Sequence, residues 1–401
     1  MSLADQIFEV KNNEQRRQAL DFGDHPSKQS LAKEHFVSYY LKVYFPIVES
    51  ILRGNGSIKA IRYIDLFSGV GKSKNGDIFV PLSVLRTTRT YDNVTYFFND
   101  KYVPDVLRDN ILKDPECSSQ LPRITISQRA GSEIDVSSLF GPGDAVISYV
   151  DSFGHQCGEP ETVARLIANP FSDCLLFLNL DHFFRFLQTN KNKDFVRFFG
   201  SDQHVREAVE KRMNLNNSDF VDWFLKDYQD RLRRLVHRPI YMFPVFFRDE
   251  PRSDIMRVVI LISKNKTGIE RIREKFVPVC DEDGNVDDSE QNFCIDGGRL
   301  FASSSAQQHF FDKELRYQLK EIIDVFPSCN GIALGREDLV QRLDQKSLEQ
   351  GGCLSIYSPK LINSCLAKIE RAHPSWFLPL SPKRRKGRYA STIVQMRKDV
   401  I

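Results

Sequence analysis

Short runs of apolar residues, rich in β-branched and aromatic side chains, recur along the first half of the chain. They occupy residues 61–65, 94–100, 144–151 and 174–180. Each run is too short for a typical helix, and segments of helical length separate one run from the next. This alternation predicts an α/β fold with a Rossmann-like parallel sheet and helices on both of its faces.

Apolar residues at helical spacing predict helices around these strands. One helix is expected to begin near residue 30 and to be kinked by Pro46, with apolar positions at Phe36, Tyr40, Val43, Tyr44, Ile47 and Ile51. A charged helical stretch at 205–236 follows the fourth strand, where a lid or a substrate-reading insertion could sit. Residues 256–263 return to a strand pattern.

Composition divides the chain into four segments. Residues 1–29 are polar, 30–276 carry the α/β pattern, and 277–309 form an acidic linker. In residues 310–401, three helical patterns and two extended segments predict a small winged-helix-like module. The helical patterns lie at 313–326, 336–344 and 359–371, and the extended segments at 376–380 and 389–394.

Charge and cysteine usage narrow the classes of function. The chain has 56 Lys and Arg against 53 Asp and Glu, so its net charge of +3 gives no overall attraction for nucleic acid, although a local patch can still bind it. The eight cysteines lack zinc-ligand spacing, so we expect reduced, structural cysteines and no metal site. No signal peptide or membrane-spanning run is evident, which predicts a cytoplasmic protein without a membrane partner.

The first strand ends in an acid and continues into a turn with two glycines. Gly69 and Gly71 follow Asp65, and glycine permits backbone conformations and close ligand approach that a Cβ would block. A nucleotide-like ligand is therefore the first hypothesis. The sequence Gly71-Lys72-Ser73 is not the end of a phosphate-binding P-loop, because Leu66 stands where that motif needs its first glycine.

Acidic residues also end the second and third strands. Asp100 stands where folds of this type hold ribose hydroxyls, and Asp151 ends the third strand. Because the carboxyl ends of parallel strands meet at one edge of a sheet, we expect a site along that edge. His155 and Cys157, just beyond Asp151, are expected to support this site rather than to act in it.

A basic run separates the two extended segments of the C-terminal module. It consists of Lys383, Arg384, Arg385, Lys386 and Arg388. At the tip of a winged-helix hairpin these side chains would contact a phosphate backbone. A solvated turn or a protein-binding surface is an equally good interpretation, since runs of charge are often solvated surface.

Several segments, in their order and spacing, resemble the three-Cys-motif partner family. They are Lys33-Glu34-His35-Phe36 with residues 39–47, then residues 63–71 (Tyr-Ile-Asp-Leu-Phe-Ser-Gly-Val-Gly), and then Pro81-Leu82. Residues 151–154 are similar to the family's Asp-Pro-Tyr-Gly element, 176–179 with Arg185 to its Phe-Asn and Arg pattern, and 259–263 to its late strand. The resemblance covers roughly residues 30–276 and implies a class I methyltransferase-like fold.

The resemblance also implies a cofactor and a site. S-adenosylmethionine (SAM) would bind at Asp65, Phe67, Gly69 and Gly71, with its ribose on Asp100. Methyl transfer needs an acceptor that is held in line with the sulfonium methyl and can lose its proton. Asp151, with Phe153 as a stacking partner, would hold that acceptor, and capping of the next helix is the alternative role for Asp151.

Two functions remain open at this point. The first is a SAM-dependent methyltransferase acting on nucleic acid or on a nucleotide-like substrate, which the acids and glycines of the predicted site favour. A cytosine C5 methyltransferase is excluded, because the chain has no Pro-Cys dipeptide. The alternative is a non-catalytic partner protein that docks nucleic acid or protein through its C-terminal module. Ser152 in place of the family's proline, and Phe79-Val80 in place of its Gly-Ser, favour this alternative.

Overall fold

The computed structural model describes residues 13–21, 28–152, 158–189, 194–248, 255–266 and 268–270, with short segments at 294–296, 299–301, 332–335, 341–342, 344–345, 348–349, 371 and 393–396. The chain forms two compact units. The first comprises Met1–Asn214, Arg231–Ile240 and Arg257–Asn265, and the second comprises Leu215–Asp230, Tyr241–Met256 and Lys266–Ile401. All predicted site residues up to Asp151 belong to the first unit.

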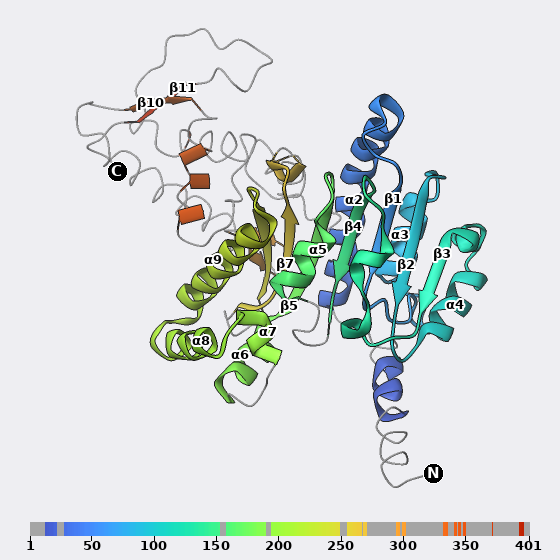
Figure 1. Ribbon diagram of the computed structural model, residues 1–401, viewed down its shortest axis with the longest axis horizontal. Helices are drawn as coiled ribbons and strands as arrows, with labels where there is room; N and C mark the ends of the chain where they lie inside the picture. Colours follow the sequence, from blue (N-terminus) through green and yellow to red (C-terminus); the bar gives the residue numbers. More distant parts are fainter. Residues whose placement is uncertain are drawn as a thin grey trace. The chain divides into compact units, whose positions relative to one another are not determined.

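A largely parallel sheet forms the centre of the first unit (Figure 1). Its strands are β1 (Ile61–Asp65), β2 (Val94–Asn99), β3 (Ile124–Ser127), β4 (Ala145–Val150), β5 (Asp173–Asn179) and β7 (Ile255–Ser263), in the order β3-β2-β1-β4-β5-β7. The strands predicted from the apolar runs are confirmed. Because the order reverses between β1 and β4, the carboxyl ends of these two strands form the crevice where such sheets bind ligands. This is a Rossmann-like sheet of the class I methyltransferase type.

Two features of the sheet differ from the prediction. First, β7 runs antiparallel to β5, with Asp173 opposite Ser263 and Asn179 opposite Arg257. It follows the preceding strand, β6 (Tyr241–Arg248), after only residues 249–254, and a connection of that length is too short for a helical crossover. Second, β3 and β6 were not predicted: β3 is a short, half-buried strand, and Pro244 interrupts the pattern of β6.

Helices connect and cover the strands. In the first unit they are α2 (Lys28–Asn55), α3 (Val80–Thr88), α4 (Pro104–Lys113), α5 (Pro160–Leu166), α6 (Leu180–Thr189), α7 (Asp194–Phe199) and α8 (Asp202–Asn214). Short 3₁₀ helices span Ser118–Arg123, Gly131–Glu133 and Val136–Leu139. Residues 217–236 form α9 (Asn217–Val236), so the predicted helical stretch after the fourth strand is confirmed as two helices, α8 and α9.

Helix α2 packs on the sheet, as its apolar spacing predicted. Phe36, Tyr40 and Tyr44 are buried, whereas Ile47 is exposed. Two tyrosine hydroxyls of the helix donate hydrogen bonds to the start of β5. Tyr40 donates to the carboxylate of Asp173, the first residue of β5, and Tyr44 donates to the carbonyl of Phe171, just before the strand, at 2.6 Å. Helix α2 therefore has a fixed register against the end of the sheet.

The second unit contains short strands. Strand β6 pairs in parallel with β9 (Arg299–Phe301), which pairs antiparallel with β8 (Cys294–Asp296). Separately, β10 (Ile332–Gly335) pairs antiparallel with β11 (Ile393–Met396). The predicted extended segment at 389–394 overlaps β11, but its partner β10 was not predicted. The other extended segment and almost all residues of the three helical patterns lie outside the described residues, so the winged-helix-like module stays a prediction.

Gly71, in the turn after β1, packs closely against Leu82 of α3 and Leu107 of α4, which gives a first testable prediction. Gly71 has a φ of +74°, and a Cβ there would lie 2.5 Å from Cδ1 of Leu82 and 2.6 Å from Cδ1 of Leu107. Gly71→Ala should lower the free energy of unfolding by about 1–3 kcal/mol more than Gly76→Ala. Gly76 also has a positive φ, +97°, but a Cβ there would meet nothing within 4 Å. Urea unfolding of both variants measures the difference, and equal losses would show that backbone strain alone accounts for the effect.

Candidate functional site

The turn after β1 is built as the glycine pair predicted. Gly69 and Gly71 both have positive φ values, +64° and +74°. The turn is attached to the end of β2, because Ser68 N donates to the carbonyl of Asn99 at 2.8 Å and Gly69 N donates to Oδ2 of Asp100 at 3.0 Å. The ends of β1 and β2 therefore form one rigid unit.

The two glycines serve different purposes. A Cβ at Gly71 would collide with buried leucines, whereas a Cβ at Gly69 would meet no heavy atom within 4 Å. Gly71 is therefore required by packing within the fold. Gly69 lines an open space at the carboxyl end of β1, where a ligand could approach the backbone.

Asp100 follows directly after β2 and organises the backbone around it. Its Oδ1 accepts hydrogen bonds from the backbone N–H groups of Tyr102 at 2.8 Å and Val103 at 2.9 Å, while Oδ2 accepts from Gly69. A carboxylate offers about four acceptor sites. Asp100 thus retains capacity for one further donor, such as the ribose hydroxyl that the sequence assigned to it, and that assignment stays a prediction.

Asp65, the last residue of β1, is fully buried and incompletely paired. Its Oδ1 accepts from Phe67 N at 3.0 Å, but among the described residues its Oδ2 has no hydrogen-bond partner. Burial raises the pKa of Asp65 well above its usual value, and the nearby charges of Asp151 and Asp100 raise it further. The strand ends therefore bring three carboxyl groups within electrostatic reach of one another.

A second unpartnered group lies on the same face of the sheet as Asp65. Tyr63 precedes Asp65 by two residues on β1, and its buried hydroxyl has no hydrogen-bond partner within the described part of the chain. Burial raises the pKa of Tyr63, and the charge of Asp65 adds to this effect. Two buried polar groups on β1 thus have no partner among the described residues, and a bound water or a polar ligand would satisfy them.

Asp151 is held in an ion pair that the sequence did not predict. Its Oδ2 lies 2.6 Å from Nζ of Lys33 and accepts a hydrogen bond from the hydroxyl of Tyr149 at 2.8 Å. The Lys33 ammonium also lies 4.1 Å from the centroid of the Phe177 ring. Both charged side chains are largely buried, with 13% of Lys33 and 18% of Asp151 exposed. Asp151 is not the N-cap of α5, since that position is Glu159.

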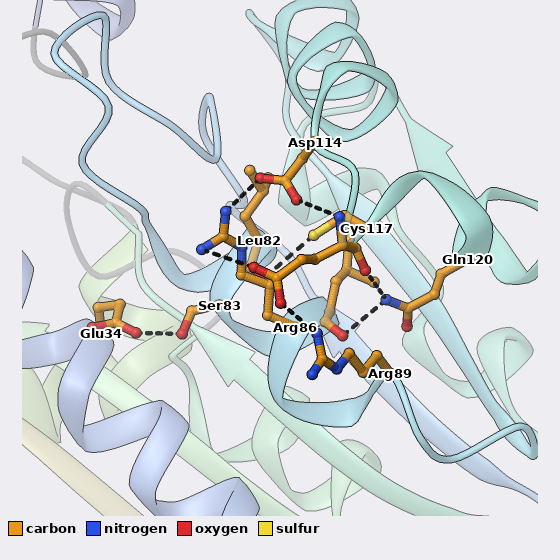
Figure 2. A network of polar contacts seen from close by, with 10 residues as sticks. Glu34, Leu82, Ser83, Arg86, Arg89, Asp114, Cys117 and Gln120 are labelled. Carbon is orange, nitrogen blue, oxygen red and sulfur yellow. Dashed lines mark hydrogen bonds and ion pairs between the residues drawn. The ribbon is translucent and has the colours of Figure 1, made fainter.

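The helix that carries Lys33 is anchored through the neighbouring residue. Glu34 accepts hydrogen bonds from the hydroxyls of Ser38 and Ser83, which joins α2 to α3. Figure 2 shows this contact beside a larger network in which Arg86 of α3 pairs with the buried Asp114 at 2.7 Å. In the same network Gln120 donates to the carbonyl of Leu85 at 2.8 Å. Helix α3 is therefore bonded to α2 through Ser83 and to Asp114 and Gln120 through Arg86 and Leu85.

Other predicted site residues fall into two groups. Phe67 is half-buried, and its backbone N–H bonds Asp65. The following predicted residues lie outside the described residues: Phe153, His155, Cys157, Lys383, Arg384, Arg385, Lys386 and Arg388. Their assignments stay predictions.

Metal and thiol chemistry find no support in the described residues. No group of three or more His, Cys, Asp or Glu side chains there is arranged to hold a metal ion. Cys117 and Cys174 are buried free thiols, and burial raises the pKa of each to about 12, so neither is a reactive nucleophile. Among the described helices, none is long and apolar enough to cross a membrane.

Comparison with known proteins adds little to this picture. No family model and no curated protein matches the chain. It is similar to a solved structure from Legionella pneumophila str. Philadelphia 1 assigned to the family DUF519, with 9% identity, 61% of this chain and 91% of that chain covered, and a TM-score of 0.36. It is also similar to a solved structure of a predicted O-methyltransferase from Agrobacterium tumefaciens, with 12% identity, 57% of this chain and 81% of that chain covered, and a TM-score of 0.26. These likenesses are too weak to bear on function, and membership in the three-Cys-motif partner family stays a prediction.

The burial of Asp65 predicts a pH-dependent stability. A carboxyl group with a raised pKa stays protonated in the folded state to a higher pH than in the unfolded chain, where its pKa is about 3.9. Its contribution to the free energy of unfolding therefore falls as pH rises through this window. Asp65→Asn removes the effect, so its stability relative to wild type should increase by about 1 kcal/mol or more between about pH 4.5 and pH 8.

Denaturant unfolding at several pH values tests this expectation. Asp109→Asn, the same substitution at an exposed position of α4, corrects for the loss of one negative charge. Parallel stability profiles for Asp65→Asn and wild type would contradict the raised pKa of Asp65.

The ion pair between Lys33 and Asp151 predicts strong energetic coupling. Lys33→Met and Asp151→Asn should each cost about 2 kcal/mol or more, because each leaves the partner's charge buried, and the double variant should cost less than their sum. Arg53 and Glu49 provide a matched control on α2, since they also lie 2.6 Å apart but 75% of Arg53 is exposed. A double-mutant cycle there should give only about 0.3–0.5 kcal/mol. Equal coupling energies in the two cycles would show that burial adds nothing to the pair.

Proposed function

We propose that this chain is a SAM-dependent methyltransferase that acts on nucleic acid or on a nucleotide-like substrate. The observation that carries the proposal is the buried Oδ2 of Asp65, which has no hydrogen-bond partner among the described residues and lies at the end of the strand that leads into the turn of Gly69. A carboxylate in this position can accept hydrogen bonds from a cationic ammonium group, and the amino group of SAM is such a group. The strand order supports this assignment, because Asp65 ends β1, and the crevice between β1 and β4 is where Rossmann-like sheets bind their ligands.

The residues present fit the cofactor. Asp65 would hold its ammonium, Asp100 has acceptor capacity for a ribose hydroxyl, and the missing Cβ of Gly69 leaves its backbone accessible. When bound, SAM supplies a methyl group on a positively charged sulfur. Carboxylates around that charge would favour binding of the cationic cofactor over its neutral product.

The rest of the proposal rests on position and resemblance. Asp151 directly follows β4, which pairs with β1 in the sheet, so it would stand beside the proposed cofactor site and hold the methyl acceptor. The motifs quoted above support a place in the three-Cys-motif partner family. The basic run at Lys383, Arg384, Arg385, Lys386 and Arg388 supports nucleic acid as the substrate class.

Calorimetric titration with SAM and with S-adenosylhomocysteine tests the binding site. The wild-type protein should bind both ligands, and Gly69→Val should abolish binding, because the valine side chain fills the open space that the ligand needs. Gly56→Val is the matched control: its φ is +65°, a Cβ there also meets nothing within 4 Å, and Gly56 precedes β1 whereas Gly69 follows it. The two variants therefore carry the same backbone strain, and only one should lose the ligand.

The possible results separate the functions. Equal affinities in Gly69→Val, Gly56→Val and wild type would remove the proposed cofactor site. Binding of SAM without transfer to any nucleic acid tested would favour the non-catalytic partner protein. Loss of binding in both glycine variants would indicate a general effect of strain rather than a local one.

A further inference from the structure

Lys33 is paired with the residue that the proposed function assigns to binding of the methyl acceptor. Asp151 is the residue proposed to hold the acceptor, and the nitrogen atom that contacts its Oδ2, at 2.6 Å, is Nζ of Lys33. Lys33 comes from α2, which is separate from the sheet, and only 13% of its side chain is exposed. The amine of this lysine is therefore inserted into the site rather than extended into solvent.

The surroundings of this amine are those that bind a substrate ammonium. They combine a carboxylate, a phenol that shares the same carboxylate oxygen, and the face of an aromatic ring 4.1 Å away. Carboxylates and aromatic faces are the groups that proteins use to bind ammonium and methylated ammonium ions. The hydrogen bonds of Glu34 to Ser38 and Ser83 hold the adjacent turn of α2 in place.

We propose that Lys33 is a site of self-methylation, with its Nζ as the methyl acceptor. This inference rests on the proposed function, because the methyl donor is SAM. Lys33 first gives a proton from its ammonium to Oδ2 of Asp151, which passes it to solvent. The lone pair of Nζ then attacks the methyl carbon, so that a C–N bond forms. The C–S bond breaks with its electron pair going to sulfur, and the sulfonium becomes the neutral thioether of S-adenosylhomocysteine.

The product of this step fits the same surroundings. A monomethylated lysine keeps its positive charge and still has N–H groups to donate to Asp151. Its contact with the Phe177 ring is also retained, since aromatic faces bind methylated ammonium ions well. Each chain supplies a single Lys33, so one methyl group per chain is the expected extent of the first transfer.

Mass spectrometry of peptides from the full-length protein tests the proposal directly. After incubation with SAM, the peptide that contains Lys33 should gain the mass of one methyl group, and Lys42, an exposed lysine on the same helix, should not. Asp151→Asn should slow the gain by about 100-fold or more, because the proton acceptor is lost. Tyr149→Phe, which removes only the phenol oxygen from Asp151, should slow it less.

A second measurement does not depend on methyl transfer. Acetic anhydride acetylates accessible lysines, and S-adenosylhomocysteine, which has no methyl group to give, should slow acetylation of Lys33 by about tenfold if it binds against this amine. Acetylation of Lys42 should not change. Quantitative peptide analysis with and without the ligand gives both rates from one sample.

The outcomes distinguish this inference from the proposed function. If calorimetry shows SAM binding but Lys33 gains no methyl group and no protection, self-methylation is wrong and the proposed function stands. If SAM does not bind, both are wrong. Methylation of Lys42 at the same rate as Lys33, or an unchanged rate in a folded Asp151→Asn protein, would also overturn the proposal, because the reaction would then not depend on the site.

Discussion

Three acidic residues lie at the carboxyl ends of neighbouring strands, and the parallel sheet forces them together. The register of β1 with β2 and β4 brings Asp65, Asp100 and Asp151 to one edge, where their charges repel. The chain relieves this repulsion differently for each acid. Backbone N–H groups bind Asp100, and the ammonium of Lys33 pairs with Asp151. Asp65 keeps one oxygen that has no partner in the described part of the chain.

Because one of the three acids is paired with a lysine of α2, this helix is part of the candidate site although it lies outside the sheet. Its Lys33 brings the cation that is paired with Asp151, and its tyrosines bind the carboxylate of Asp173 and the carbonyl of Phe171. The Lys33 contact lies at the carboxyl end of β4, and the two tyrosine contacts lie at the amino end of β5. The helix is therefore aligned along the strands. A change in that alignment would separate Lys33 from Asp151 and return the unpaired charge to the edge of the sheet.

The sequence predicted those parts of the fold that depend on local pattern. Apolar runs located the main strands, and the position of an acid at a strand end placed Asp65, Asp100 and Asp151 at one edge. Strand β3 was not predicted, because three half-buried residues and one exposed residue give no clear apolar run. The direction of β7 depends on the short connection from β6, which the strand pattern alone does not show. Lys33 belongs to the segment that resembles the family, but the sequence did not identify it as a site residue, because 118 positions separate it from Asp151 and only the folded chain brings them together.

The asymmetry among the three acids has a functional meaning. A site that bound its ligand by shape alone would be more stable with every acid partnered, as Asp100 is by backbone N–H groups and Asp151 is by Lys33. A buried Oδ2 of Asp65 without a partner among the described residues raises the free energy of the folded protein. A cationic ligand would remove that cost on binding, so the instability stored at the end of β1 would be converted into affinity. In the function proposed above, this acid at the end of β1 would therefore be the group that favours a cationic ligand.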